Sequence, residues 1–225
     1  SNTASGYGSL YLNTTGHSNT ASGYYSLFAN TTGNYNTASG YSSLHANTTG
    51  TRNIAMGYGA LDGQDTENDN LAIGHNALGG AIAGGEYNVA IGNYSLDANT
   101  SGGWNTAVGY DAMTSNIGGD KNTSIGFQSL QANTEGNKNV AIGMYSMYAN
   151  TTAADNVAVG YESLKVNTTG TQNAAVGYGS LDANTTGAYN TSLGWDSGNE
   201  ITSGTYNTVI GHNASASGAT AVNQT

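Results

Sequence analysis

Four acidic residues cluster in one segment of the sequence: Asp62, Asp65, Glu67 and Asp69. Carboxylate oxygens are the ligands that Ca²⁺ prefers in proteins, so this segment is a candidate calcium site. The spacing differs from that of an EF-hand loop, and glycine is not where such a loop needs it. A solvated acidic loop without a metal is therefore the interpretation that the sequence favours, and calcium is the one cofactor it suggests.

Four histidines could serve as acid–base groups: His17, His45, His75 and His212. His75 and His212 occupy a place in the sequence pattern that tyrosine fills elsewhere, whereas His17 and His45 fall at turns or strand edges. No nucleophile or second acid accompanies them in the pattern that a catalytic triad or a metal cluster requires. The sequence therefore predicts a protein that is not an enzyme.

Aromatic residues recur at one position of the pattern, and a column of exposed rings could hold sugar rings. The candidate ligand contacts are Tyr7, Tyr24, Tyr41, Tyr58 and Trp195. Packing between successive turns of the chain explains such a column as well, and we prefer that interpretation. The same column continues at Tyr110, Phe127, Tyr161 and Tyr178.

Asn-Thr-Thr or Asn-Thr-Ser segments recur, and each is a sequon for N-glycosylation. The candidate glycosylation sites are Asn13, Asn30, Asn47, Asn99, Asn150, Asn167 and Asn184. Turn formation is the simpler reason for asparagine at these places, because asparagine tolerates left-handed backbone conformations. Regular rows of threonine could also bind ice, so ice binding is a distant alternative function.

All these candidates belong to one repeat of 17 residues, N-T-A-[S/I/V]-G-Y-x-S-L-x-A-N-T-T-G-x-x, which we number from position 1. One interval, from Asn70 to Asn88, has 18 residues. A repeat this short holds two short strands, roughly N-T-A-I-G and Y-x-S-L-x-A, separated by turns. The sequence predicts an all-β fold, a parallel β-solenoid of thirteen coils in a single domain spanning 1–225, with an irregular segment at 62–87. A coil is one repeat, and the coils start at 2, 19, 36, 53, 70, 88, 105, 122, 139, 156, 173, 190 and 207.

Position 5 is glycine in every coil, which indicates a positive φ or a place without room for a Cβ atom. Small residues at position 3 and leucine or methionine at position 9 predict a narrow apolar interior. Stacked asparagines at position 1 predict an amide ladder between coils. The structural glycines are Gly6, Gly23, Gly40, Gly57, Gly74, Gly92, Gly109, Gly126, Gly143, Gly160, Gly177, Gly194 and Gly211.

Positions 2 and 4 point away from position 3 on a strand. They are polar in the first three coils, as in Thr3 and Ser5, and largely apolar from Ile54 and Met56 onward. A strand that is apolar on both faces is buried on both faces. We therefore expect a homo-oligomer, preferably a trimer, that covers the second face; a monomeric solenoid wide enough to enclose both faces is the alternative.

The segments Asn88-Val-Ala-Ile-Gly92, Asn139-Val-Ala-Ile-Gly143 and Asn156-Val-Ala-Val-Gly160, each followed by x-x-Ser-Leu or x-x-Ser-Met, resemble the head repeats of YadA-like trimeric autotransporter adhesins. Similar repeats are found in phage tail fibres and long bacterial surface proteins. The resemblance implies a left-handed β-roll, assembly as a trimer, and attachment to host surfaces. It covers all thirteen coils, although this repeat is longer than the family's usual one and the coils themselves include no neck, coiled-coil stalk or membrane anchor.

Charged residues make up 8% of the chain, and the net charge is −10 with four basic residues in no patch. Nucleic-acid binding is therefore disfavoured, because it needs clustered Lys or Arg. The sequence contains no apolar run of 18 residues, so it predicts no membrane insertion by this segment. The chain starts without Met inside a repeat, which suggests processing or a piece of a longer protein. We expect an extracellular location, on a cell or virion surface, with end-to-end filaments as the alternative assembly and a host-surface or glycan ligand.

Overall fold

The computed structural model describes residues 1–63, 66–80 and 85–223. The regular elements in this part of the chain are β-strands of three residues. They belong to two compact units, residues 1–118 and 119–225. The first unit contains β1 (Thr3–Ser5), β2 (Thr20–Ser22), β3 (Thr37–Ser39), β4 (Ile54–Met56), β5 (Leu71–Ile73), β6 (Val89–Ile91) and β7 (Thr106–Val108). The second contains β8 (Thr123–Ile125), β9 (Val140–Ile142), β10 (Val157–Val159), β11 (Ala174–Val176), β12 (Thr191–Leu193) and β13 (Thr208–Ile210).

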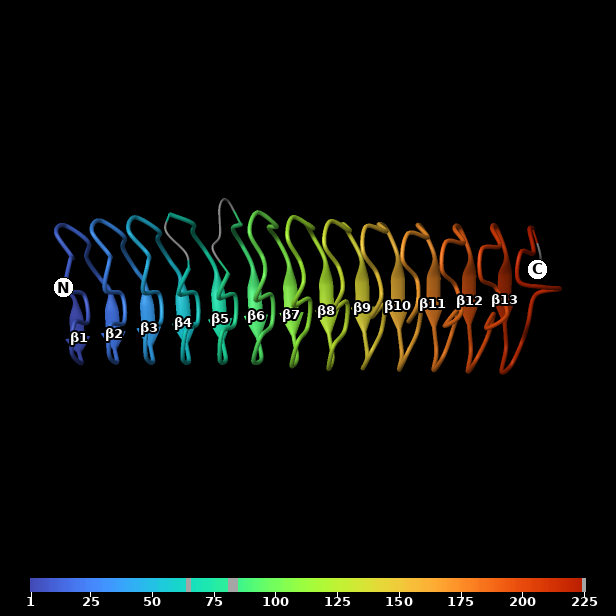
Figure 1. Ribbon diagram of the computed structural model, residues 1–225, viewed down its shortest axis with the longest axis horizontal. Coiled ribbons are helices and arrows are strands. Elements are labelled where there is room, and N and C mark those ends of the chain that lie inside the picture. The colour runs from blue at the N-terminus through green and yellow to red at the C-terminus, as the bar shows by residue number, and fades with distance from the viewer. Residues whose placement is uncertain (64–65, 81–84, 224–225) are drawn as a thin grey trace. The chain divides into compact units, whose positions relative to one another are not determined.

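Within each unit the strands are parallel and follow one another in chain order (Figure 1). Ala21 of β2 pairs with Ala38 of β3, and Val157 of β10 pairs with Ala174 of β11, so equivalent positions of successive coils lie side by side. The predicted parallel β-solenoid is confirmed. Leu71 pairs with Val89, so β5 and β6 keep this register across the 18-residue interval. Residues 64–65 and 81–84 of the predicted irregular segment lie outside the described part.

The second predicted strand, Y-x-S-L-x-A, is wrong: among the described residues every coil has its strand at positions 2–4, and most coils have turns at positions 6–11. Positions 7 and 9 adopt left-handed conformations, with φ of 55° at Tyr25 and 50° at Leu27. The backbone still bonds to both neighbouring coils, because Tyr25 N–H donates to Tyr7 O at 2.9 Å and Leu27 N–H donates to Ser43 O at 3.0 Å. Hydrogen bonds between coils therefore continue through a segment that is not extended.

The glycine at position 5 is required for two reasons at once. At Gly23 φ is 137°, a conformation that residues with a side chain rarely adopt. A Cβ atom there would also overlap the carbonyl group of Gly40 in the next coil. The predicted structural role of this column is therefore explained by close approach of neighbouring backbones as well as by φ.

The interior is narrow, and in most coils it is filled by small residues and one large apolar side chain. In the second coil Ala21, Ser26 and Leu27 are fully buried. The Ser26 hydroxyl donates to Gly23 O at 3.1 Å, so a buried polar group has its partner. The buried residues at position 9 are Leu27, Leu44, Leu61, Leu78, Leu96 and Met113 in the first unit, and Leu130, Met147, Leu164 and Leu181 in the second.

Two asparagine ladders hold the turns between coils. At position 1, Asn36 N–H donates to Asn19 Oδ1 at 2.9 Å. At position 12, Asn30 Nδ2 donates to Asn13 Oδ1 at 2.8 Å. The carbonyl oxygen of Gly33 accepts from both ladders, at 2.8 Å from Asn19 Nδ2 and 3.1 Å from Asn30 Nδ2. The predicted amide ladder at position 1 is thus present, and a second ladder closes the other side of the same turn.

The side chains at positions 2 and 4 point outward, whereas the residue between them is buried. In β4, Ile54 is 41% exposed and Met56 is 46% exposed, while Ala55 is fully buried. A wide solenoid that encloses both faces of the strand is therefore wrong for this chain. None of the residues that the structure describes belongs to a helix with the length and hydropathy of a membrane span.

Candidate functional site

The predicted aromatic column at position 6 exists in the first unit as a stack of rings. Tyr7 and Tyr24 lie with ring centroids 5.3 Å apart, and Tyr24–Tyr41 and Tyr41–Tyr58 are each 5.1 Å apart. The interplanar angles are 18°, 7° and 6°, so the rings are nearly parallel. The parallel register of β1–β4 produces this stack, because it places one tyrosine per coil at the same point of the turn.

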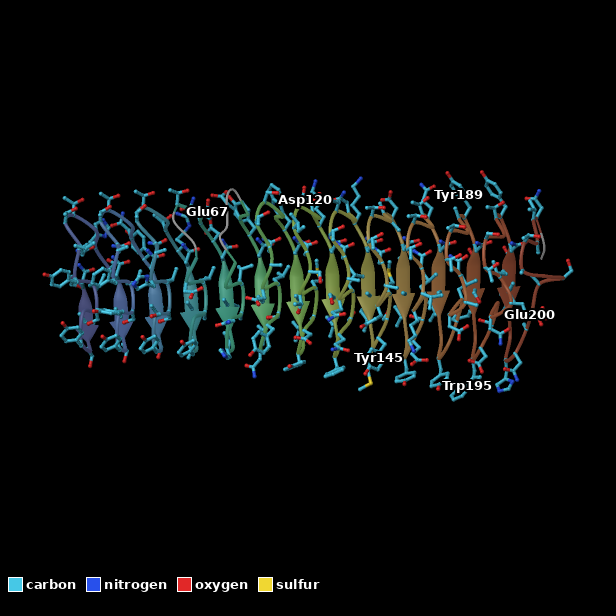
Figure 2. The ribbon with its side chains drawn as sticks, in the orientation of Figure 1. Glu67, Asp120, Tyr145, Tyr189, Trp195 and Glu200 are labelled. Carbon is cyan, nitrogen blue, oxygen red and sulfur yellow. The ribbon has the colours of Figure 1, made fainter. Side chains whose placement is uncertain are left out.

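The second unit contains a similar stack. Tyr161 and Tyr178 are 5.0 Å apart, and Tyr178 and Trp195 are 4.0 Å apart at an angle of 5°. Figure 2 shows Trp195 and Tyr145 at one edge of the coils and Tyr189 at the opposite edge. Tyr189 has its own stacked partner, Tyr206, at 4.7 Å. Both edges of this unit therefore carry paired rings.

Stacking turns the ring faces of these columns toward one another and leaves edges and hydroxyls toward solvent. Tyr24 and Tyr41 remain 41% and 47% exposed. A hydrogen bond with Tyr25 raises the pKa of Tyr24 to about 12. The geometry supports the packing interpretation for the inner rings, because a sugar stacks on a ring face and those faces already have neighbours.

A second aromatic row lies beside the first in the same unit. At position 10, Tyr11 and Phe28 are stacked at 5.5 Å and 4°, and Phe28 and His45 at 5.4 Å and 6°. Tyr25 bridges the two rows, at 4.2 Å from Tyr24 and 4.9 Å from Phe28. Sequence reasoning missed this row, although aromatic residues at an interval of 17 were its signal.

The two rows enclose a cavity of about 440 Å³ at the first two coils. It is lined by Tyr7, Gly8, Tyr11, Tyr25 and Phe28. Gly8 occupies position 7, where the next coil has Tyr25, and a Cβ atom on Gly8 would overlap the Tyr25 ring. The missing side chain therefore opens the space and lets the Tyr25 ring lie across it.

Among the described residues, the candidate calcium ligands Asp62, Glu67 and Asp69 belong to no group of three that could hold a metal ion. Asp69 forms a bidentate ion pair with Arg52, at 2.6 and 2.7 Å, and this contact lowers the pKa of Asp69. Glu67 is buried and accepts from the backbone N–H of Thr66 at 3.0 Å. Partial burial raises the pKa of Asp62. Asp65 lies outside the described residues, and within them no group of three acidic or histidine side chains could hold a metal ion.

The histidines lie among aromatic rings. His17 meets Tyr35 edge to face at 5.4 Å, His75 meets Tyr58 edge to face at 5.0 Å, and His45 stacks on Phe28. His212 lies 6.4 Å from Trp195 at an angle of 18°. The role these contacts indicate is packing along the coils.

The candidate glycosylation asparagines form the ladder at position 12. Six of the seven are fully buried, and Asn13 is half-buried. Their amide nitrogens are the donors of the ladder, as in Asn184 Nδ2 to Asn167 Oδ1 at 2.9 Å. A glycan on such a nitrogen would require the side chain to leave the ladder. The fully buried residues are Asn30, Asn47, Asn99, Asn150, Asn167 and Asn184.

Comparison with known proteins adds no relative. No family model matches the chain, and no curated protein or solved structure is significantly similar to it.

Proposed function

We propose that this chain is a rigid, non-enzymatic segment of an extracellular fibre, which presents a surface for attachment or for building a filament. Two features support the proposal. The interior is occupied by hydrogen-bonded amides and small side chains, which provide rigidity. Asp69 and Glu162 form ion pairs, and the histidines pack against aromatic rings. The outer surface carries the variation between coils, as expected where recognition or assembly takes place.

The observation that carries the proposal is the outward apolar face of the strands. In the second unit Leu193 and Ile210 are 49% and 66% exposed. Burial of one Val or Ile side chain contributes about 1.5–3 kcal/mol, so a row of them gives a strong drive for association. The outward apolar residues are Ile54, Met56, Leu71, Ile73, Val89, Ile91 and Val108 in the first unit, and Ile125, Val140, Ile142, Val157, Val159, Val176, Leu193 and Ile210 in the second.

The partner that we propose for this face is further copies of the same chain, preferably in a trimer. The chain itself supplies a contrast, because β1–β3 carry Thr and Ser at the same outward positions. The outward Thr and Ser side chains of those strands can stay in contact with water, whereas the outward apolar side chains of the later strands are stabilised by burial. Assembly through the apolar strands would leave the polar coils and the aromatic edges available for contact with a surface.

The test is the molar mass in solution, measured by light scattering. The proposal predicts three times the chain mass of 22.8 kDa for the native sequence. Replacing Ile142 and Val159 together with Ser, the residue that β2 and β3 carry at this position, should weaken the assembly. The matched control replaces Ser22 and Ser39 with Thr and should leave the mass unchanged. A native chain at the mass of one copy would contradict the proposal, and a concentration-dependent series of masses would indicate end-to-end filaments instead.

A second proposed function is carbohydrate binding, as in the receptor-recognition part of a phage tail fibre. The specific observation in its favour is the cavity between the two aromatic rows of the first unit. Binding of a glycan array by the native chain tests it, and the absence of binding to any glycan would contradict it.

A further inference from the structure

We propose that the aromatic stack of Tyr161, Tyr178 and Trp195 in the second unit is a redox relay, which carries an oxidising equivalent from the Trp195 indole to the Tyr161 phenol. A one-electron oxidant in solution takes the first electron from Trp195. The three rings occupy position 6 of successive coils. This activity goes beyond the proposed structural role, and it depends neither on assembly nor on a sugar ligand.

The first step concerns the overlap of the three rings. Tyr178 lies 4.0 Å from Trp195 at an interplanar angle of 5°, and 5.0 Å from Tyr161 at 14°. Stacked rings at these distances leave no room for another side chain between them. Electron transfer weakens steeply with separation, so two short steps through Tyr178 are favoured. Trp195 is 48% exposed, although a further coil follows it, so an oxidant in solution can reach the indole.

The second step concerns the two ends of the stack. In the coil before Tyr161, position 6 is Met144, and Tyr145 of that coil meets Tyr161 edge to face at 6.3 Å and 80°. The parallel rings therefore end at Tyr161. At the other end His212 lies 6.4 Å from Trp195. Imidazole is harder to oxidise than phenol, so an electron vacancy on Trp195 is filled from the tyrosines of the stack.

The third step concerns proton acceptors, which lie at both ends. The indole Nε1–H of Trp195 donates to Asp196 Oδ2 at 3.0 Å. The Tyr161 phenol donates to the carboxylate of Glu162, and this hydrogen bond raises the pKa of Tyr161. Lys165 Nζ donates to Glu162 Oε1 at 2.7 Å and holds the same carboxylate in place. Each terminal ring therefore has a carboxylate from position 7 of its own coil as a partner for its proton.

The proton acceptors also give the relay a direction. The residue after Tyr178 is Gly179, which has no side chain to accept a proton. A phenol is easier to oxidise when a base takes its proton as the electron leaves, because the charge of the radical cation is then removed. Tyr161, with its bond to Glu162, is therefore the ring on which the radical comes to rest.

The electrons and protons balance at every step. Trp195 loses one electron to the oxidant and its Nε1 proton to Asp196, which leaves a neutral indolyl radical. That radical takes an electron from Tyr178 and recovers its proton from Asp196. Tyr178 releases its phenol proton to water and regains one when Tyr161 reduces it, while the Tyr161 proton passes to Glu162. The net change in the rings is the loss of one electron and one proton from Tyr161.

The experiment oxidises the full chain with azide radicals generated by pulse radiolysis. Every sample carries Trp104→Phe, so that Trp195 is the one indole in the chain. Absorption spectroscopy follows the indolyl and phenoxyl radicals, which absorb in separate bands. A series of chain concentrations separates transfer within one chain from transfer between chains, and melting temperatures check that each variant is folded.

The proposal predicts first-order decay of the indolyl radical, with an equal rise of phenoxyl radical, at a rate independent of concentration. Tyr178→Phe should slow this decay at least tenfold, because its phenyl ring can stack but cannot reduce the indolyl radical. The control is Tyr189→Phe, the same change in the same coil, at the opposite edge where Tyr189 stacks on Tyr206 (Figure 2). Equal rates in Y178F and Y189F, or indolyl decay without a phenoxyl radical, would overturn the relay.

A second measurement locates the radical, with a nitroso spin trap and mass spectrometry of the peptides. The adduct should lie on Tyr161, and Glu162→Gln should shift it to Tyr178. Lys165→Gln is the control, because it breaks the ion pair but keeps the carboxylate, and its adduct should stay on Tyr161. An adduct that stays on Tyr161 in E162Q would overturn the role of Glu162. An adduct on Tyr178 or Trp195 without either change would overturn Tyr161 as the end of the relay.

Discussion

Asn36 Oδ1 accepts the backbone N–H of Asn53 in the next coil at 2.9 Å, while Asn36 Nδ2 donates to Gly50 O at 2.7 Å across its own coil. One buried side chain therefore joins two coils and closes one turn. The same arrangement recurs in the second unit, where Asn156 Oδ1 accepts the backbone N–H of Asn173 and Asn156 Nδ2 donates to Gly170 O. Such bonds are needed because no water reaches these backbone groups to replace them.

Asn36→Ala should destabilise the fold strongly, because it leaves the Asn53 N–H without a partner and removes one donor to Gly50 O. Each unsatisfied buried group costs about 1–3 kcal/mol, and a loss of this size lowers the melting temperature of a chain this long by about 2–12 °C. Thermal melting followed by circular dichroism measures the effect. Asn199→Ala, at an exposed asparagine, is the control and should melt as the native chain does.

Gly40→Ala should be far more harmful than Gly59→Ala. At Gly40 φ is 137°, and a Cβ atom would overlap the backbone carbonyl group of Gly57, which cannot move without breaking the stack. At Gly59 φ is 60°, and the atom in the way is the side-chain oxygen of Asn76, which can rotate. We expect a cost of about 1–2 kcal/mol for G59A and the loss of a cooperative melting transition for G40A. Equal melting curves for the two variants would contradict this account of position 5.

Ser42→Gly should stabilise the protein slightly. Ser42 lies at position 7 with φ of 52°, a left-handed conformation that costs a residue with a side chain about 1–2 kcal/mol. Glycine removes this cost, but its greater backbone entropy stabilises the unfolded chain by about 0.5–1 kcal/mol. The net change expected in chemical denaturation is a gain of about 0.5 kcal/mol. A clear loss of stability would show that the Ser42 side chain contributes more than its conformation costs.

Asp182 makes stability depend on pH in the opposite sense to an ordinary ion-paired carboxylate. Partial burial, and then the nearby charge of Asp196, raise the pKa of Asp182 in the folded chain. The folded state therefore holds the proton more tightly than the unfolded state, and its stability falls as pH rises through the unfolded and then the folded pKa. Asp182→Asn should raise the melting temperature at pH 7, and the difference should vanish below about pH 3.9. A lower melting temperature for D182N at pH 7 would contradict the prediction.

The repeat interval predicted the register, the glycine column and the asparagine ladder, because each depends on identity between residues that become neighbours. The second strand could not be predicted in its true form, since Leu27 reads as a strand residue and its φ of 50° is stabilised by burial and by a bond to Ser43 that exists only in the stack. The cavity was missed for a similar reason. It arises where Gly8 and Tyr25 meet across two coils, and each residue alone looks ordinary.

The central claim is that equivalent residues of successive 17-residue coils lie side by side, and disulfide scanning tests it most directly because the chain has no cysteine of its own. Thr20 and Thr37 are paired across β2 and β3, and their outward side chains are accessible. Adjacent parallel strands lie about 4.8 Å apart, within the Cα distance that a disulfide spans. The chain with Thr20→Cys and Thr37→Cys should form an intramolecular disulfide under mild oxidation, and the offset pair Thr20→Cys with Ser39→Cys should form little. Faster closure of the offset pair, or no closure of the matched pair, would contradict the parallel stack.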